Sequence, residues 1–206
     1  VTCDTAYEVA PEGDCRHHVV AFDYGIKRNI INCLLAQGCR VTVVPATTSA
    51  DEALGLNPDG IFLSNGPGDP RPLGYAIDTA RQLVERADRP IFGICLGHEI
   101  LGLALGAKIY KLKFGHRGAN QPIREDSTGR ILITAENHGW AIRADNLPDC
   151  LEVTRLNLND GCVEGMKHRD LPIFSIQCHP EASPGPHDSF HLFGAFSEMM
   201  SQRHAA

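Results

Sequence analysis

Cys95 is the side chain best placed for covalent chemistry, because glycine stands two residues away on either side of it in Gly93-Ile94-Cys95-Leu96-Gly97. The apolar run at 90–94 is typical of a buried strand, and residues 97–105 have apolar side chains at helical spacing. Cys95 is therefore predicted on a tight strand-to-helix turn, where glycine relieves crowding and the helix N-terminus favours a thiolate. A buried cysteine of a core strand is the alternative.

A thiol nucleophile needs a base, and Gln177-Cys178-His179-Pro180-Glu181 supplies a histidine with a carboxylate two residues later. The segment follows a strand-like run at 171–176, and Pro180 disfavours helical angles at His179. On an extended segment the two side chains face the same side, so the carboxylate can orient the imidazole. The alternative is a surface loop whose His and Glu contact only water.

The loop at 63–70, Leu63-Ser64-Asn65-Gly66-Pro67-Gly68-Asp69-Pro70, follows an apolar strand at 60–63. Two glycines and two prolines make it stiff while leaving backbone amides accessible. The amide of Gly68, with that of Leu96, is a candidate oxyanion hole. An ordinary turn after a strand is the alternative.

These segments need a scaffold that brings them together. Apolar strand-like runs alternate with helical stretches; the strands are expected at 18–22, 40–44, 60–63 and 91–94, and the helices near 26–37 and 75–86. This alternation predicts an α/β fold with a mostly parallel sheet, helices on both faces, and the ligand at the carboxyl ends of the strands.

The middle of the chain has a different pattern. Residues 108–167 are expected to form short strands broken by Gly, Asn and Asp, including 131–135 and 151–155, as a small antiparallel extension. A final helix is expected at 189–202, with Asp188 as its cap.

Three segments, in chain order, resemble the class I (triad-type) glutamine amidotransferases: residues 65–70, residues 93–98 and His179-Pro180-Glu181. Four further segments resemble the small, glutaminase subunit of carbamoyl phosphate synthetase; they are residues 21–30, 114–120, 136–140 and 181–188. The stretches around Asn137 and Ser183 are the more specific ones. The resemblance implies the class I glutamine amidotransferase fold for residues 18–206, with residues 1–17 as a linker from a preceding domain.

The resemblance also implies a reaction. The thiolate of Cys95 attacks the side-chain amide of glutamine, ammonia leaves to a large synthetase subunit, and water releases glutamate from a thioester. His179 acts as base and then as acid, and Glu181 orients it. Further residues are implied to line the glutamine site; they are Gly66, Gly68, Leu96, Asn137, Gly139 and Trp140. Trp140 could instead fill the core, and Asn137 and Gly139 could form a hairpin turn.

Glu99 departs from the family pattern, which has glutamine after Gly97-His98. An amide donates and accepts hydrogen bonds, whereas an ionised carboxylate only accepts. Glu99 could therefore pair with the substrate ammonium group or repel the substrate carboxylate. The sequence leaves both outcomes open.

Composition limits the other partners. Nineteen basic and 25 acidic residues give a net charge of −6, which argues against nucleic acid, and no apolar run reaches membrane-spanning length. A cytoplasmic location with reduced cysteines is expected. No metal or cofactor is expected in this chain: Cys15, His17 and His18 lack a second ligand pair at zinc spacing, and ATP, bicarbonate and Mg are expected only in the large subunit.

Two other functions remain open. One is a triad glutaminase that serves anthranilate or guanylate formation, against which residues 137–139 and 183–186 argue. The other is a non-catalytic scaffold, for which Glu99 is the one hint and against which the intact Cys95, His179 and Glu181 argue.

Overall fold

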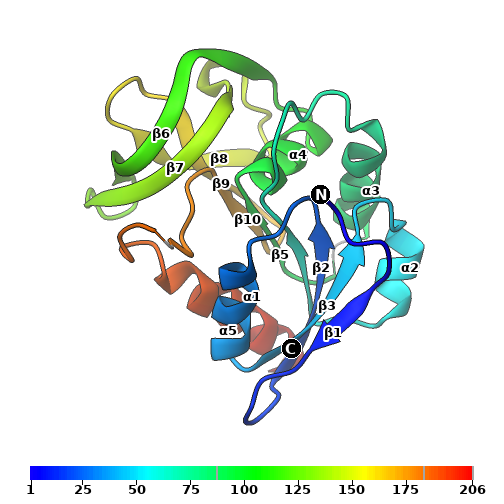
Figure 1. The fold of residues 1–206 in the computed structure, drawn as a ribbon. Helices are drawn as coiled ribbons and strands as arrows, with labels where there is room; N and C mark the ends of the chain where they lie inside the picture. Colours follow the sequence, from blue (N-terminus) through cyan, green and yellow to red (C-terminus); the bar gives the residue numbers. More distant parts are fainter. Residues whose placement is uncertain (87, 183, 206) are drawn as a thin grey trace.

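The computed structural model describes residues 1–86, 88–182 and 184–205. A ten-stranded sheet forms its centre, and helices pack on both of its faces at one end (Figure 1). The strands are β1 (Tyr7–Val9), β2 (His17–Asp23), β3 (Cys39–Pro45), β4 (Gly60–Leu63), β5 (Ile91–Ile94), β6 (Ile109–Glu125), β7 (Ile131–Ile142), β8 (Leu151–Asn157), β9 (Val163–His168) and β10 (Ile173–Ile176). The helices are α1 (Arg28–Ala36), α2 (Ala50–Gly55), α3 (Gly74–Glu85), α4 (Leu96–Ala104) and α5 (His191–Ala205), with a 3-10 turn η1 at Ala144–Asn146.

The parallel part of the sheet has the order β3-β2-β4-β5-β10. All residues of β2, β4 and β5 are buried, as expected for parallel strands covered on both faces. Their carboxyl ends therefore lie at one edge, where the loop after β4, Cys95 after β5 and His179 after β10 come together. This edge is the position predicted for the ligand.

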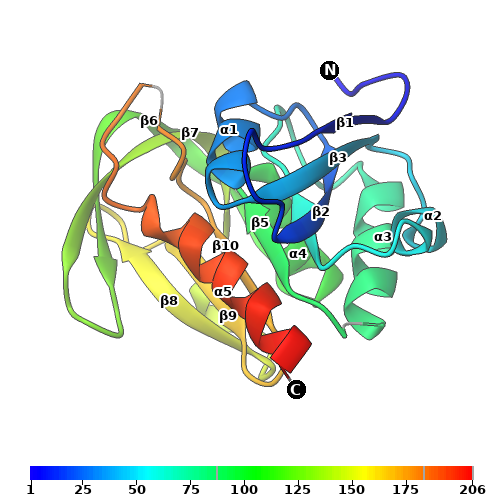
Figure 2. The ribbon, with the colours of Figure 1, turned by 90° about the horizontal axis from the view of Figure 1, so that it is seen from below.

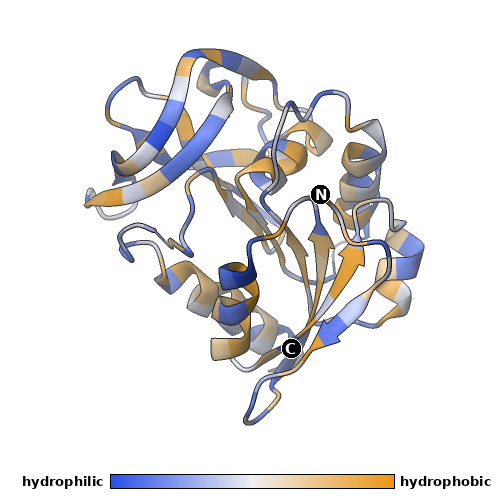
Figure 3. Cartoon of the chain, viewed as in Figure 1, coloured by the Kyte–Doolittle hydropathy of each residue, from blue (hydrophilic) through white to orange (hydrophobic). Residues whose placement is uncertain are grey.

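Each face of the sheet has its own core. On one face α1 and α5 cover residues such as Phe62, Phe92 and Ile94; on the other, α2, α3 and α4 cover residues such as Phe22 and Leu63 (Figure 2). The ring of Phe92 contacts four other phenylalanine rings at centroid distances of 4.3 to 5.9 Å. Figure 3 shows the apolar colour concentrated in these inner strands, while β6 and β7 mix polar and apolar residues. The prediction of helices on both faces is confirmed.

The prediction of a mostly parallel sheet with a small antiparallel extension is wrong in its proportions. Five strands are added by antiparallel pairing, and β6, β7, β9 and β8 pair in a closed ring. Instead of short strands, β6 and β7 are 17 and 12 residues long. Register shifts between Lys111 and His116 and between Gly118 and Gln121 allow these strands to continue past the irregular glycine-containing stretches that suggested breaks. We call these four strands the antiparallel ring.

The predicted cap of the final helix needs correction. Asp188 does not cap α5, which begins at His191; its carboxylate accepts a hydrogen bond from the Ile133 amide at 3.0 Å. The short helix α2 was not predicted. Ser49 and Glu52 form a capping box at its start.

The amino-terminal segment contains a strand that its polar sequence did not suggest. β1 pairs antiparallel with β3, opposite residues 41–43. The predicted linker at residues 1–17 and the domain boundary that follows it stay predictions. Ser183 lies outside the described residues. Among the described residues, no helix is long and apolar enough to cross a bilayer.

Candidate active site

Cys95 occupies the turn between β5 and α4 with a backbone φ of 53°, in a region that non-glycine residues rarely adopt. Its amide donates to the carbonyl of Ile176 at 2.9 Å, which fixes the turn against β10. A Cβ atom on Gly97 would lie 2.1 Å from the Leu63 carbonyl oxygen, and one on Gly93 would lie 2.8 Å from the Gly97 oxygen. Both glycines are therefore required for this turn to pack, as its sequence suggested.

His179 and Glu181 lie beside this turn and contact each other. The Nδ1 atom of His179 is 2.7 Å from Oε1 of Glu181, and both residues are buried. Lys27 places its Nζ atom 3.0 Å from the same carboxylate oxygen. Burial raises the pKa of Glu181, but the hydrogen bond from His179 and the charges of His179 and Lys27 outweigh burial and lower it. Glu181 is thus an ionised acceptor that orients the ring.

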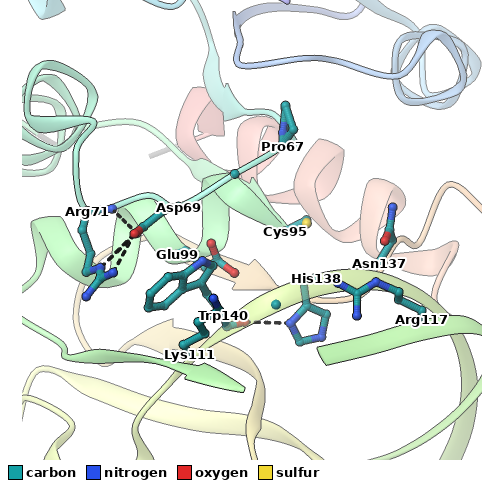
Figure 4. A pocket seen from close by; sticks show the side chains of 13 residues that line it. Pro67, Asp69, Arg71, Cys95, Glu99, Lys111, Arg117, Asn137, His138 and Trp140 are labelled. Carbon is teal, nitrogen blue, oxygen red and sulfur yellow. Dashed lines mark hydrogen bonds and ion pairs between the residues drawn. The ribbon is translucent and has the colours of Figure 1, made fainter. Parts of the chain in front are cut away.

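Two cavities meet at Cys95. The larger, of about 600 Å³, is lined by most of the predicted binding residues; they are Gly66, Gly68, Glu99, Asn137, Gly139 and Trp140. The smaller, of about 210 Å³, is lined by Cys95, His179, Lys27 and Asn137 among others. Figure 4 shows the larger cavity, with the sulfur of Cys95 facing it. The structure therefore brings the predicted nucleophile, base and binding residues to one place.

The electrostatic setting of Cys95 differs from the sequence expectation. Burial raises the pKa of its thiol, and the charges of Glu99 and Glu181 raise it further. The backbone hydrogen bond of Leu96 and the charge of Lys27 lower it by less. Because burial is the largest effect, the helix end alone does not bring the pKa of Cys95 below its ordinary value.

The backbone amides of Leu96 and Gly68, the predicted oxyanion donors, lie at the start of α4 and in the loop after β4. Leu96 is the first residue of α4, so its amide has no partner within the helix, and it forms the hydrogen bond that lowers the pKa of Cys95. Gly68 has a φ of 102° and no atom within 4 Å of an added Cβ. Its positive φ is one that other residues avoid, and it lines the same cavity as Cys95.

Asn137, Gly139 and Trp140 lie inside β7, so the alternative of a hairpin turn is wrong. Trp140 does not fill the core: its half-buried ring lines the larger cavity, and the Arg71 guanidinium lies 4.1 Å above it. Arg71 in turn pairs with Asp69 at 2.7 Å. The ring of Trp140 is thus one wall of the cavity, held by a cation from the loop after β4.

Glu99 is 3% exposed and lines the larger cavity one helical turn after Cys95. One of its oxygens accepts a hydrogen bond from the Gln177 amide at 3.2 Å. Burial raises the pKa of Glu99 to about 8, although the His138 charge and the Gln177 hydrogen bond lower it. Glu99, the residue that departs from the family pattern, therefore lies in the larger cavity together with Cys95.

Two buried histidines and two buried glutamates form a cluster inside the antiparallel ring, next to the stretch of β7 that contains Asn137 and Gly139. His116, Glu136, His138 and Glu164 have potential ligand atoms within 4.8 Å of one another, which is close enough for a metal ion. The histidines also lie 3.1 and 3.2 Å from Glu136, as ion pairs. A hydrogen bond to Glu164, together with nearby carboxylates, raises the pKa of His116 to about 9 against its burial. Protons on the histidines therefore balance the carboxylates.

Residues 15–18 do not form the cluster of ligands that was considered there. His17 Nε2 lies 3.0 Å from Ser201 Oγ, and His18 Nε2 lies 2.8 Å from Thr42 Oγ1. All eight cysteines are free thiols, as expected.

Lys27 and Gln177 were missed as site residues. Gln177 directly follows the carboxyl end of β10, and Lys27 ends the turn that follows β2. Ligand-binding residues gather at the carboxyl ends of parallel strands. The cluster inside the antiparallel ring had a weaker signal: Glu136 and His138 alternate along one strand, but His116 and Glu164 come from two others. Only the folded ring shows that they meet.

Comparison with known proteins gives a consistent result. The family glutamine amidotransferase class-I matches residues 20–199. The carbamoyl phosphate synthase small chain of Chlorobaculum tepidum is 61% identical over 190 residues, covering 92% of this chain and 52% of the relative. That of Syntrophotalea carbinolica is 55% identical, covering 92% and 50%. The chain spans about half the length of the curated relatives it matches.

Two solved structures share the fold. A putative GMP synthase subunit from Thermoplasma acidophilum has a TM-score of 0.80 at 22% identity, covering 91% of this chain and 96% of that one. A glutamine amidotransferase from Thermotoga maritima has a TM-score of 0.64 at 16% identity, covering 92% and 86%. At these identities the likeness concerns the fold alone.

Proposed function

The chain belongs to the class I glutamine amidotransferase family, and on that premise we propose that it hydrolyses glutamine and supplies the ammonia to carbamoyl phosphate synthesis. The observation on which this depends is the placement of Cys95. It sits at positive φ at the start of α4, on a cavity that it shares with His179, which Glu181 orients at 2.7 Å. A nucleophile, a base and an orienting carboxylate are the three parts that such a reaction needs.

The proposed reaction has two halves. His179 takes the proton of Cys95, the sulfur attacks the side-chain carbonyl carbon of glutamine, and the oxygen becomes an oxyanion near the amides of Leu96 and Gly68. The carbon–nitrogen bond then breaks, and His179 gives the proton to the leaving ammonia. In the second half, water gives a proton to His179 and attacks the thioester, so that glutamate and the free thiol are released.

The raised pKa of Cys95 supports a requirement for substrate in this scheme. A buried neutral thiol is a weak nucleophile, so Cys95 reacts slowly until its proton is removed. Proton transfer to His179 becomes favourable when the substrate carbonyl accepts the developing charge. The ion pair with Glu181 places the positive charge of Lys27 close to the forming imidazolium of His179. The negative charge of Glu181 offsets the repulsion between these two cations.

The partner and the acceptor follow from the relatives. Carbamoyl phosphate synthase small chains are 55 and 61% identical to this chain, which supports transfer of the ammonia to a large synthetase subunit. ATP, bicarbonate and Mg are then bound by that subunit, and this chain contributes no cofactor. The same identities speak against anthranilate or guanylate formation and against a scaffold without catalysis.

Glutamate release tests the proposal. The chain is assayed with glutamine, alone and with a carbamoyl phosphate synthetase large subunit, MgATP and bicarbonate. We expect slow release alone, a higher rate with the partner, and carbamoyl phosphate only with the partner. Cys95→Ser is expected to lower turnover by about a thousandfold or more while glutamine still binds.

Two results would contradict the proposal. Glutamate release that persists in Cys95→Ser would remove the covalent mechanism. Glutamate release that the large subunit leaves unchanged, without carbamoyl phosphate, would leave a glutaminase with a different acceptor.

A further inference from the structure

Glu99 is a buried carboxyl group without a cationic partner. Its side chain is 3% exposed, and it forms no ion pair with any residue that the structure describes. Its carboxyl group accepts a hydrogen bond from the side-chain amide of Gln177 at 3.2 Å. A buried carboxylate with so little compensation is unfavourable, and such a group stays protonated instead.

The surroundings of Glu99 do not reverse this preference. The titratable and charged groups that line the cavity with it are Cys95 on the same helix, Asp69 and Arg71 of the loop after β4, Lys111 and Arg117 of β6, and His138 of β7. Arg71 is already paired with Asp69, and Asp69 itself disfavours a charge on Glu99. The charge of His138 acts in the other direction but is shared with Glu136 at 3.2 Å. Burial remains the largest effect and sets the pKa near 8.

The charge state of Glu99 also affects the nucleophile. Glu99 is one of the two carboxyl groups whose negative charge raises the pKa of Cys95. The other, Glu181, is held ionised by His179 and Lys27. Protonation of Glu99 therefore removes the one opposing charge near the sulfur that can be removed without disrupting the catalytic pair.

We propose that Glu99 works as a neutral carboxylic acid, which donates a hydrogen bond to bound glutamine beside Cys95, and that its ionisation turns the site off at alkaline pH. The inference rests on the proposed glutaminase function. A protonated carboxyl group has an O–H donor and a carbonyl acceptor in one plane, so it can replace one N–H donor and the acceptor of a primary amide. Gln177 occupies one oxygen of Glu99, which leaves the other for the ligand.

This inference replaces the two outcomes that the sequence left open. Pairing with the substrate ammonium group and repulsion of the substrate carboxylate both require an ionised Glu99. Below its pKa neither operates, and the group takes the place of the amide that the family pattern has there. Above its pKa the proton passes to solvent, the donor is lost, and the charge opposes the thiolate.

A titration without substrate tests the protonation state directly. The chain is labelled with ¹³C at the glutamate side-chain carboxyl carbon, and the Glu99 resonance is assigned by its loss in Glu99→Gln, or in Glu99→Asp if the first variant does not fold. We expect a midpoint near pH 8. A midpoint at pH 4 to 5, about the ordinary glutamate value, would overturn the inference whatever the enzyme does.

A second measurement tests the consequence for the nucleophile. Alkylation of Cys95 by the neutral reagent iodoacetamide is followed by mass spectrometry of its peptide from pH 6 to 10, with kcat/KM for glutamine over the same range. Between pH 7 and 9 the protonated fraction of a group with a pKa of 8 falls about tenfold, so kcat/KM of the unmodified chain should fall by that factor relative to Glu99→Gln. At a given pH above 8, alkylation of Cys95 should be faster in Glu99→Gln than in the unmodified chain, because the charge of Glu99 raises the pKa of the thiol.

Asp145→Asn is the control, since Asp145 is an exposed carboxylate outside this cavity whose pKa is lowered by Arg143. It should keep the alkaline fall of the unmodified chain. Superimposable alkylation and rate profiles for the unmodified chain and Glu99→Gln would overturn the inference. If no variant hydrolyses glutamine, the proposed function fails, while the titration and alkylation still decide the state of Glu99.

Discussion

The charges around Cys95 have separate roles, which single substitutions distinguish. Glu181 contributes both a hydrogen-bond acceptor and a charge to His179, and Lys27 contacts the same oxygen at 3.0 Å. A glutamine side chain at position 181 keeps an acceptor but loses the charge that stabilises the imidazolium. The geometry of the ring is therefore retained while its basicity falls.

We therefore expect Glu181→Gln to lower kcat by about a hundredfold, less than the loss of about a thousandfold or more in His179→Asn. Steady-state glutamate release measures both. Lys27→Met is the matched control on the outer side of Glu181 and should have a smaller effect than either. Equal losses in Glu181→Gln and His179→Asn would show that the charge matters as much as the base itself.

At the scale of single elements, the β5–α4 turn depends on backbone contact with β4. A Cβ on Gly97 would be 2.1 Å from the Leu63 carbonyl oxygen, an atom of a buried strand that cannot move aside. The clash would force α4 away from β4 and shift both Cys95 and Glu99. The close packing of α4 against β4 therefore depends on the lack of a side chain at Gly97.

Gly97→Ala is expected to destabilise the chain by more than about 3 kcal/mol and to abolish glutamate release. Gly74→Ala is the matched control, because Gly74 is the first residue of α3 and no atom lies within 4 Å of an added Cβ. Its unfolding free energy should change by less than about 0.5 kcal/mol. Urea unfolding followed by circular dichroism checks both, and a stable Gly97→Ala chain would contradict the packing argument.

The elements of the parallel half could be predicted from the sequence because each is marked by a local pattern. The strands β4 and β5 have the predicted bounds, and each end of α1 and α3 differs from the predicted one by one or two residues. The antiparallel ring could not be predicted in this way. Its long strands contain glycine, asparagine and proline, and their pairing involves residues far apart in sequence, such as Ile123 with Asn157.

The candidate site shows the same division. The turn around Cys95 and the His179–Glu181 pair are contained in short motifs, so their placement followed from the strands before them. The state of Glu99 did not, because it depends on burial and on Gln177, which is 78 residues away. The helix end lowers the pKa of Cys95 as expected, but burial, which no local motif reveals, raises it by more.

At the scale of the whole molecule, two buried groups make stability depend on pH. The folded pKa of Glu99 is about 8 against an ordinary 4.5, and that of His116 is about 9 against 6.5. Between each pair of values the folded chain retains a proton that the unfolded chain has lost. Folding stability therefore falls as pH rises through these windows, by at most about 1.4 kcal/mol per pH unit for each group.

We expect the free energy of unfolding to decline between about pH 5 and pH 9 from these two groups, and Glu99→Gln to remove the part of the decline below pH 8. Urea unfolding at fixed ionic strength, at pH 5, 7 and 9, measures this. The difference in unfolding free energy between variant and unmodified chain should grow up to pH 8 and then stay constant. A difference independent of pH would mean that Glu99 is ionised in the folded chain.

Strand β10 joins the two halves of the sheet, since it pairs parallel with β5 and antiparallel with β9. Cys95 and His179 follow strands of the parallel half, whereas Asn137, Gly139 and Trp140 belong to the antiparallel ring. The residues that line the two cavities at Cys95 therefore come from both halves of the sheet. The backbone amide of His179 donates to the carbonyl of Ala135 in β7 at 2.8 Å, so a shift of the ring reaches the candidate base directly.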